Sequence, residues 1–384
     1  DYFSETLRDR KSFNQEFRAV SDSADFQKNS FFEWVIGANY LELKESNLKK
    51  DDGLYGDPSD PYGPYASASA SSSKYKSSNF SVFGNLDYLL SASLKFSIGL
   101  RWEDWEADYS DSLQESFNPT DKMSGGKISL IKNMTNDTNM YASLAKGYKQ
   151  GGFNLGLGLD ANATNKNLAY DPEFLTNYEL GINTKLLDSR ITFNGVLFYS
   201  DREDQQVLIS TQTDPSDPNT FSFLTQNAAE GVNHGLEINM DMDINQSLSA
   251  FVNLGILKTE IKNWQSRQDL EGRSQAHAPE RSYALGLNWA PTSHTYLAID
   301  FTGKSSFYYS DSHNNKSKSY VLTNLNLGYV KNNWNYELWA RNIFDEYYSV
   351  RGFYFGNEAP NFIDTLYERH GDPRHIGLSI RYDF

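Results

Sequence analysis

The sequence predicts an all-β protein, an antiparallel β-barrel that spans a membrane. Three observations carry this prediction: the final residues alternate strictly between apolar and polar, similar segments recur along the whole chain, and no long apolar run is present. A tilted strand of roughly nine to eleven residues crosses the core of a bilayer. Alternation gives each such strand one face for lipid and one face for water.

The final segment, residues 374–384, shows this alternation most clearly. Its even positions are apolar: Ile376, Leu378, Ile380, Tyr382 and Phe384. Its odd positions from His375 to Asp383 are small, polar or charged, and we expect them to face away from lipid. A strand of a soluble sandwich alternates too, but seldom for so long. The terminal phenylalanine resembles the C-terminal signature of bacterial outer-membrane barrels.

Composition excludes several other classes of protein. The chain has 384 residues, a net charge of -15 and a mean hydropathy of -0.63, without a run that could form a transmembrane helix. An aromatic content of 15% suits the aromatic girdles of a barrel. Cysteine is absent and the six histidines show no ligand spacing, so we expect no metal site and no cofactor. The negative charge argues against a nucleic-acid partner.

The first third of the chain predicts two strands, a long loop and a hairpin. We expect strands at 13–20 and 32–41, followed by a loop at 45–78 that is rich in Gly, Pro, Asp and low-complexity Ser/Ala sequence. The clearest hairpin joins 80–90 to 94–102 through a tight turn at 91–93. No signal peptide is visible at the start, which indicates a mature, trimmed or partial chain.

The remaining segments repeat the same unit of strand, short turn, strand and long loop. Expected strands lie at 127–134, 139–146, 177–186, 191–199 with an extension toward Ile209, 236–244, 248–261, 283–289, 297–301, 321–329 and 334–340. The predicted loops include 148–172, 214–219, 304–319 and 345–373. Glu237, Asp241 and Asp243 share one strand face, which must meet water as in a wide lumen.

The whole chain therefore has about fifteen strands whose connections are short and long in turn. This is the outer-membrane arrangement, with short turns in the periplasm and long loops outside the cell. Placing Phe384 on the periplasmic side keeps every long loop extracellular.

Several motifs resemble the TonB-dependent receptors of Gram-negative outer membranes. They are YASLAKGYKQGGFN at 141–154, NYELG at 177–181, GLEIN at 235–239, NIFDEY at 342–347, and GDPR at 371–374 with the terminal RYDF. They cover roughly 240 residues in the order expected for the family.

This resemblance implies a 22-stranded barrel filled by an N-terminal plug that contacts TonB. The chain has room for about fifteen strands and no plug-like segment, so we expect residues 1–384 to be the C-terminal portion of such a barrel. The missing strands are then either absent from this sequence or supplied by a second chain. Expected partners are outer-membrane lipid and lipopolysaccharide, the TonB complex through a plug outside this chain, and a small-molecule ligand.

The resemblance also implies a function, the TonB-dependent uptake of a scarce nutrient, with a ferric siderophore as the first candidate. Oligosaccharides, cobalamin and haem stay open as cargoes. A passive porin and a surface scaffold that docks partner proteins are the two alternatives. No nucleophile, base and orienting group stand out together, so we expect no enzymatic activity and no catalytic residue.

Aromatic residues at the bases of the long loops are the candidate ligand contacts, because rings offer stiff apolar area and a tyrosine hydroxyl can orient a polar ligand. The candidates are Tyr148, Phe153, Asn154, Phe307, Tyr308, Tyr309, Tyr354 and Phe355. The alternative interpretation assigns the rings to the interfacial girdle. Charges on the water-facing side are expected to pair across strands. They include Glu179, Glu237, Asp241, Glu337, Arg101 and Arg341.

Overall fold

The computed structural model describes residues 2–21, 31–55, 65–112, 116–154, 169–212, 221–264, 267–356, 358 and 363–384. Nearly all of them lie in antiparallel strands or in the turns between strands. The helix η2 is a single 3-10 turn at Gln268–Leu270. Among the described residues, none of the helices has the length and apolarity of a membrane span.

The chain divides into two compact units. The first comprises Asp1–Leu89, Ser97–Ile128 and Lys146–Glu173, and the second comprises Leu90–Phe96, Ser129–Ala145 and Phe174–Phe384. The strands β3, β4, β6 and β7 contribute residues to both units.

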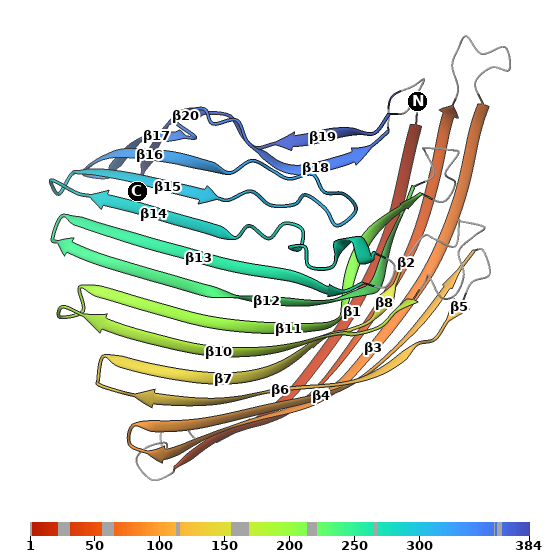
Figure 1. Cartoon of the computed structure of the whole chain (residues 1–384), viewed down its shortest axis with the longest axis horizontal. Helices are drawn as coiled ribbons and strands as arrows, with labels where there is room; N and C mark the ends of the chain where they lie inside the picture. The colour runs from red at the N-terminus through yellow and green to blue at the C-terminus, as the bar shows by residue number, and fades with distance from the viewer. Residues whose placement is uncertain are drawn as a thin grey trace. The chain divides into compact units, whose positions relative to one another are not determined.

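The first unit is built on long strands hydrogen-bonded in the order β1-β2-β3-β4-β6, with the short β5 on β4 (Figure 1). Their bounds are β1 Tyr2–Val20, β2 Phe32–Tyr55, β3 Tyr65–Ser91, β4 Leu94–Asp111, β5 Ser116–Phe117 and β6 Thr120–Asn133. β7 spans Thr138–Lys149, and the small pair β8 Gly152–Phe153 and β9 Ala169–Tyr170 follows it.

In the second unit the strands pair in the order β7-β10-β11-β12-β13-β14-β15-β16-β17-β20, lying side by side in Figure 1. Their bounds are β10 Glu173–Leu186, β11 Ile191–Gln212, β12 Phe221–Asn245, β13 Leu248–Asn263, β14 Arg281–Trp289, β15 Thr295–Lys304, β16 Tyr320–Lys331, β17 Trp334–Arg341 and β20 His375–Tyr382. A separate hairpin pairs β18 Ser349–Phe355 with β19 Thr365–His370.

The predicted short turns are confirmed. β3 ends at Ser91 and β4 begins at Leu94, and connections of two to five residues join β6 to β7, β10 to β11, β12 to β13, β14 to β15 and β16 to β17. The turn after β10 places Leu187, Asp188 and Ser189 at φ of 53°, 55° and 65°, in the left-handed region. Within the described residues the main path of paired strands contains fifteen members, as the sequence predicted.

One face of the second unit is apolar. Leu297 of β15 is opposite Leu327, which is opposite Leu338, which is opposite Leu378 of β20. Leu327, Leu338 and Leu378 are exposed although their backbones are fully paired. Leucines that are exposed in register across neighbouring strands form a surface suited to lipid hydrocarbon.

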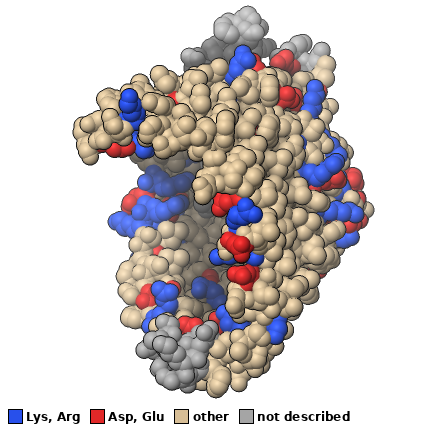
Figure 2. Space-filling model, turned by 90° about the vertical axis from the view of Figure 1, so that its left-hand side faces the viewer, with Lys and Arg blue, Asp and Glu red and all other residues tan. Residues whose placement is uncertain are grey.

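The other face is polar, as the alternation predicted. Asn324 donates from Nδ2 to the Asp300 carboxylate at 2.7 Å across β15 and β16. Tyr296 donates to Glu337 at 2.6 Å, so that carboxylate is engaged across strands as expected. Arg101 instead pairs with Glu103, two positions along the same strand, because alternate residues of one strand share a face. On the molecular face in Figure 2, Lys and Arg lie beside Asp and Glu in mixed groups.

Several predicted boundaries were wrong; β12, for example, begins at Phe221 and not near residue 236. β1 begins at Tyr2 and not near residue 13. The stretch 45–78 was predicted as a loop, but it is strand up to Tyr55 and again from Tyr65, in unbroken register with its partner strand. Alternating Ser and Ala are compatible with an extended backbone, and pairing with residues 44–55 satisfies the hydrogen-bonding groups of that backbone.

Residues 56–64 and the predicted loop 214–219 lie outside the described residues. The predicted loop 345–373 contains the β18–β19 hairpin, in which the rings of Phe355 and Tyr367 are tilted by 42° with their centroids 5.4 Å apart.

Candidate functional site

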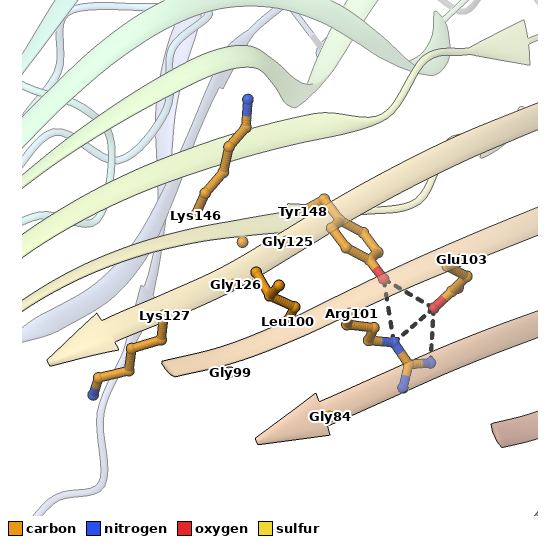
Figure 3. A pocket seen from close by; sticks show the side chains of 11 residues that line it. Gly84, Gly99, Leu100, Arg101, Glu103, Gly125, Gly126, Lys127, Lys146 and Tyr148 are labelled. Carbon is orange, nitrogen blue, oxygen red and sulfur yellow. Dashed lines mark hydrogen bonds and ion pairs between the residues drawn. The ribbon is translucent and has the colours of Figure 1, made fainter. Parts of the chain in front are cut away.

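A depression of about 480 Å³ lies on the polar face of the first unit (Figure 3). Three side chains that contact one another form part of its lining: Arg101 and Glu103 from β4, and Tyr148 from β7. Five glycines, Leu100, Lys127 and Lys146 complete the lining; the glycines are Gly84, Gly99, Gly125, Gly126 and Gly147.

The glycines keep this depression open. A Cβ on Gly125 would lie 2.7 Å from the carbonyl oxygen of Lys146 and 3.2 Å from the ring of Tyr148. Any other residue at position 125 would therefore push the Tyr148 ring away. From Asn139 to Ala145 the half-buried positions of β7 are odd-numbered, and the next one is Tyr148, so the alternation changes phase around Gly147 and brings this tyrosine onto the polar face.

Glu103 is the centre of the hydrogen-bond network in the depression. Its buried carboxylate accepts from Arg101 Nε at 3.0 Å, from Arg101 Nη2 at 2.8 Å and from the Tyr148 hydroxyl at 3.1 Å. Asn79 adds a fourth bond at 2.7 Å and also donates to Gln150. Arg101 Nε also donates to the Tyr148 hydroxyl at 3.2 Å, which fixes the ring. Lys127 and Lys146 also belong to the lining, although their side chains extend away from this group (Figure 3), so the lining as a whole carries more positive than negative charge.

Phe153 belongs to an aromatic cluster of the same unit. Its ring lies 5.9 Å from Tyr75, 5.7 Å from Tyr109 and 6.1 Å from Phe117. Phe153 and Tyr148 both pack against the buried group of Trp105, Ala107 and Met123. The neighbouring candidate, Asn154, is buried. The structure thus brings Tyr148 and Phe153 to one apolar cluster.

Phe307 and Tyr309 are buried inside the connection between β15 and β16. Their rings meet at 87° with centroids 5.9 Å apart. The Tyr309 hydroxyl donates a short hydrogen bond to Glu368 of β19. Burial, followed by this bond to a carboxylate, raises the pKa of Tyr309 to about 12. Both rings therefore pack the loop, and any ligand contact would need that packing to open.

Tyr308 lies between two cations. The Arg273 guanidinium carbon is 4.3 Å and the Lys316 ammonium nitrogen 4.1 Å from its ring centroid, both at cation–π distance. Arg273 also bonds the Asp311 carboxylate at 2.8 Å and the backbone oxygens of Ser310 and His313 at 3.1 and 3.0 Å. One arginine therefore ties the connection after β13 to the connection after β15.

The last two candidates lie on β18. Tyr354 is exposed, with its ring 5.9 Å from that of His313, and Phe355 is half-buried against Tyr367. Tyr354 is thus the most accessible of the proposed ring contacts in the second unit.

Sequence reasoning missed Arg273, Tyr75, Tyr109 and Phe117 as members of these clusters. Tyr109 follows the odd-numbered phase that Arg101 and Glu103 establish on β4, and that phase could have indicated it. Arg273 gave no such signal, since its partners are residues 310–314 of another connection.

Comparison with known proteins identifies the family of this chain. The sequence model for a TonB dependent receptor-like β-barrel matches residues 1–343. This chain belongs to the TonB-dependent receptors. The match, together with the antiparallel strands and their alternating connections, confirms the predicted transmembrane β-barrel fold.

Relatives of this TonB-dependent receptor chain share its fold at low sequence identity. The pesticin receptor of Yersinia pestis is 23% identical over 267 residues, which cover 67% of this chain and 36% of the relative. The ferric yersiniabactin uptake receptor FyuA from Yersinia pestis aligns with a TM-score of 0.78, at 18% identity, over 100% of this chain and 55% of its own. The siderophore receptor PiuA from Acinetobacter baumannii aligns with a TM-score of 0.73 at 16% identity, over 98% of this chain and 56% of its own.

The TonB-dependent receptor chain thus spans about a third of the curated relative and just over half of the solved structures. Members of the family are outer-membrane transport receptors that bind small-molecule ligands, and the chain is an outer-membrane protein. The exposed apolar face of its strands is the surface such a location requires.

Proposed function

We propose that residues 1–384 form the C-terminal part of the barrel wall in a receptor for TonB-dependent uptake of a ferric siderophore. Membership in the receptor family supports this, and both similar solved structures are siderophore receptors. A plug outside this chain contacts the TonB complex. The remaining strands are supplied by the rest of the same polypeptide or by a second chain, and lipid and lipopolysaccharide surround the barrel.

The observation that carries the proposal is the depression and aromatic cluster of the first unit. Arg101, Lys127 and Lys146 supply three positive charges against the single carboxylate of Glu103 in the lining. Ferric siderophores present oxygen-rich, commonly anionic surfaces, which suit cations and stacking rings. The proposed contacts are Tyr148, Phe153, Asn154, Phe307, Tyr308, Tyr309, Tyr354 and Phe355. They require no catalytic step and no nucleic acid.

Growth under iron limitation tests the uptake itself. A strain lacking the receptor and its parent are compared on single iron sources: ferric citrate, a ferric catecholate, a ferric hydroxamate and haem. The proposal expects a selective growth defect on one siderophore class, restored by the gene carried on a plasmid. Equal growth of both strains on every source would overturn it.

Ligand binding by the full-length receptor in detergent tests the contacts. Tyr148→Phe removes the hydroxyl that bonds Glu103 and Arg101, and Tyr354→Ala removes an exposed ring. Each is expected to weaken binding of the supporting siderophore by about fivefold to tenfold. Tyr178→Phe, on the exposed apolar face, is the matched control and should bind as the parent does. Equal affinities for all variants would remove these contacts from the proposal.

The porin alternative predicts a different electrical behaviour. A wide open lumen gives a large, steady single-channel current in a planar bilayer, whereas a plugged receptor gives none. The full-length receptor is expected to stay closed. A steady ohmic current would replace active uptake with passive diffusion as the proposed function.

A further inference from the structure

A β-bulge in β11 turns one glutamine toward the polar face of the second unit. The pairing of β11 with β12 places Arg202 opposite Gly231, and the next pair is Gln205 opposite Ala229. The extra residue of the bulge reverses the alternation of the strand, so Gln205 faces the same side as Gly231. Asp204, inside the bulge, has a φ of 53°, which is uncommon for a residue other than glycine. Bulges and strained residues occur often beside binding sites.

A second glutamine reaches the same place from the connection between β13 and β14. The N–H of Gln275 donates to the Thr259 hydroxyl of β13 at 2.9 Å, which holds this residue against the strands. Gln275 Nε2 and Gln205 Oε1 lie 2.6 Å and 3.0 Å from the position that a Cβ on Gly231 would take. A side chain at position 231 would therefore displace the Gln275 amide. With glycine there, a polar group close to Gly231 is within reach of both amides.

Three buried polar atoms lie at or beside Gly231 without a hydrogen-bond partner among the described residues. They are Gln205 Oε1, Gln275 Nε2 and Asn233 Oδ1. Asn233 is two residues from Gly231 on the same face and directly opposite Thr259. Gln275 as a whole is only 8% exposed. Burial of an amide without a partner is unfavourable, so three such atoms in one place indicate a polar group that bonds to them.

The chemistry of these atoms indicates which kind of group they bind. All three side chains are uncharged primary amides, and two of the three atoms are oxygens that accept hydrogen bonds. A carboxylate or catecholate oxygen offers these acceptors no hydrogen, and burial of its charge beside them is unfavourable. Arg202, opposite Gly231, is already engaged in an interaction of its own. An amide or a hydroxyl supplies both a hydrogen for the oxygens and an oxygen for Gln275.

We infer that Gln205, Asn233 and Gln275 bind uncharged amide or hydroxyl groups of the transported ligand. This inference rests on the proposed function and narrows the ligand to an amide-bearing complex, such as a ferric hydroxamate, in place of a polycarboxylate. Gln205 and Asn233 belong to the strands, whereas Gln275 belongs to the β13–β14 connection. A ligand that bonds to all three therefore also holds this connection against the strands.

The test compares two ferric complexes on the full-length receptor in detergent. One is the complex of acetylated desferrioxamine B, an uncharged trihydroxamate with amide groups in its linkers, and the other is ferric citrate. The variants Gln205→Leu, Asn233→Leu and Gln275→Leu each remove one amide. Gln268→Leu changes an exposed glutamine of the same connection and is the matched control. Isothermal titration calorimetry measures the affinity for both complexes and for the trihydroxamate without iron.

Each of the three variants is expected to bind the trihydroxamate about tenfold more weakly than the parent, because one hydrogen bond is lost. Gln268→Leu should bind it as the parent does, and the affinity for ferric citrate should be the same in all of them. Hydrogen exchange over 267–280 should slow when the trihydroxamate binds to the parent or the control, but not to Gln275→Leu. Equal trihydroxamate affinities of the parent and the three variants, or no saturable binding of the trihydroxamate, would overturn the inference.

Two further outcomes separate this site from the fold and from the proposed uptake. A lower unfolding temperature of the three variants with unchanged trihydroxamate affinity would assign the amides to contacts inside the receptor, and would overturn the inference. A growth defect on ferric citrate alone would leave the proposed uptake standing and overturn this class of ligand. If growth is equal on every iron source, the proposed uptake fails, and the titration with the iron-free trihydroxamate still decides whether the amides bind such a ligand.

Discussion

The ring of Tyr296 lies over Gly328, the residue directly opposite it on the neighbouring strand. A Cβ at position 328 would collide with the ring, so only glycine fits beneath it. From this position the tyrosine hydroxyl reaches one strand further and donates to Glu337 at 2.6 Å. One side chain thus links β15, β16 and β17 on the polar face.

The same arrangement recurs on the polar face of both units. Besides Tyr148 and Gly125, six pairs of the described residues place an aromatic ring against a glycine of a paired strand: Phe83 and Gly37, Tyr141 and Gly181, Phe198 and Gly235, Phe251 and Gly286, Tyr296 and Gly328, and Trp339 and Gly377. Each of these pairs joins two strands that a long connection links. A slip of one residue would place the ring against a side chain, so the pairs favour one register where no tight turn sets it.

Gly328→Ala is expected to lower the free energy of unfolding by about 1–3 kcal/mol, because the methyl group forces the Tyr296 ring out of place. Urea unfolding of the full-length receptor in detergent measures this change. Gly147→Ala is the matched control, since no atom lies within 4 Å of its added Cβ. If both variants unfold at the same urea concentration, the ring does not restrain position 328.

Most strands could be predicted from the sequence, because the alternation of apolar and polar residues is visible within each segment alone. It could not predict that 45–55 and 65–78 continue as strands, because their extension depends on pairing between segments far apart in sequence. The aromatic candidates show the same limit. Tyr309 and Tyr354 look alike in sequence, yet contacts with residues 349–368 bury the first while the second is exposed.

Asn342, in the motif that indicated the family, holds the end of β17 at a φ of 48°. Its side chain donates to the backbone oxygens of Glu346 at 2.9 Å and Asp372 at 3.1 Å, and accepts from the Glu346 N–H at 2.8 Å. Asp345 fixes the same corner by accepting from the Arg374 N–H at 2.8 Å. The motif is therefore explained by backbone geometry, without a ligand.

Asn342→Ala is expected to lower the free energy of unfolding by about 2–4 kcal/mol, because the three hydrogen bonds of a buried side chain are lost. Asn342→Asp keeps the acceptor and loses both donated hydrogen bonds, so its free energy of unfolding should lie between those of the alanine variant and the parent. Thermal unfolding of the full-length receptor ranks the stabilities of the parent and the two variants. An alanine variant as stable as the parent would contradict the structural role.

Arg273 and Arg267 offer a comparison between a buried and a more exposed ion pair in one connection. The Arg273 side chain is 8% exposed beside Asp311, whereas Arg267 is 31% exposed and its partner Asp269 is 59% exposed. Arg273→Ala removes the cation from Asp311, which keeps only the bond from the Ala276 N–H, and a local loss of about 3–5 kcal/mol is expected. Arg267→Ala should cost about 0–1 kcal/mol. Hydrogen exchange over 267–280 and 305–319 measures both, and an equal loss of protection in the two variants would contradict the comparison.

The connection around His313 is expected to loosen in mild acid. Burial, with a smaller contribution from the Arg273 charge, lowers the pKa of His313 below its ordinary value of 6.5, while a bond with the Gly352 backbone opposes the shift. Its Nδ1 accepts from the Asn315 N–H at 3.2 Å, which requires the unprotonated nitrogen. The opened connection therefore binds more protons than the closed one, so closure is most stable above pH 6.5 and weakens as pH falls through that value toward the lowered pKa.

Hydrogen exchange over 305–319 at pH 7.5 and pH 5.5, corrected for the intrinsic dependence of exchange on pH, measures this weakening. A loss of about tenfold in protection corresponds to one unit of lowered pKa. His313→Gln keeps an acceptor near Asn315 but cannot titrate in this range, so its protection should be the same at both values of pH. His294, in the exposed turn between β14 and β15, provides the matched control, and His294→Gln should keep the parent's pH dependence over 305–319. If the parent and His313→Gln respond alike to acid, another group controls the connection.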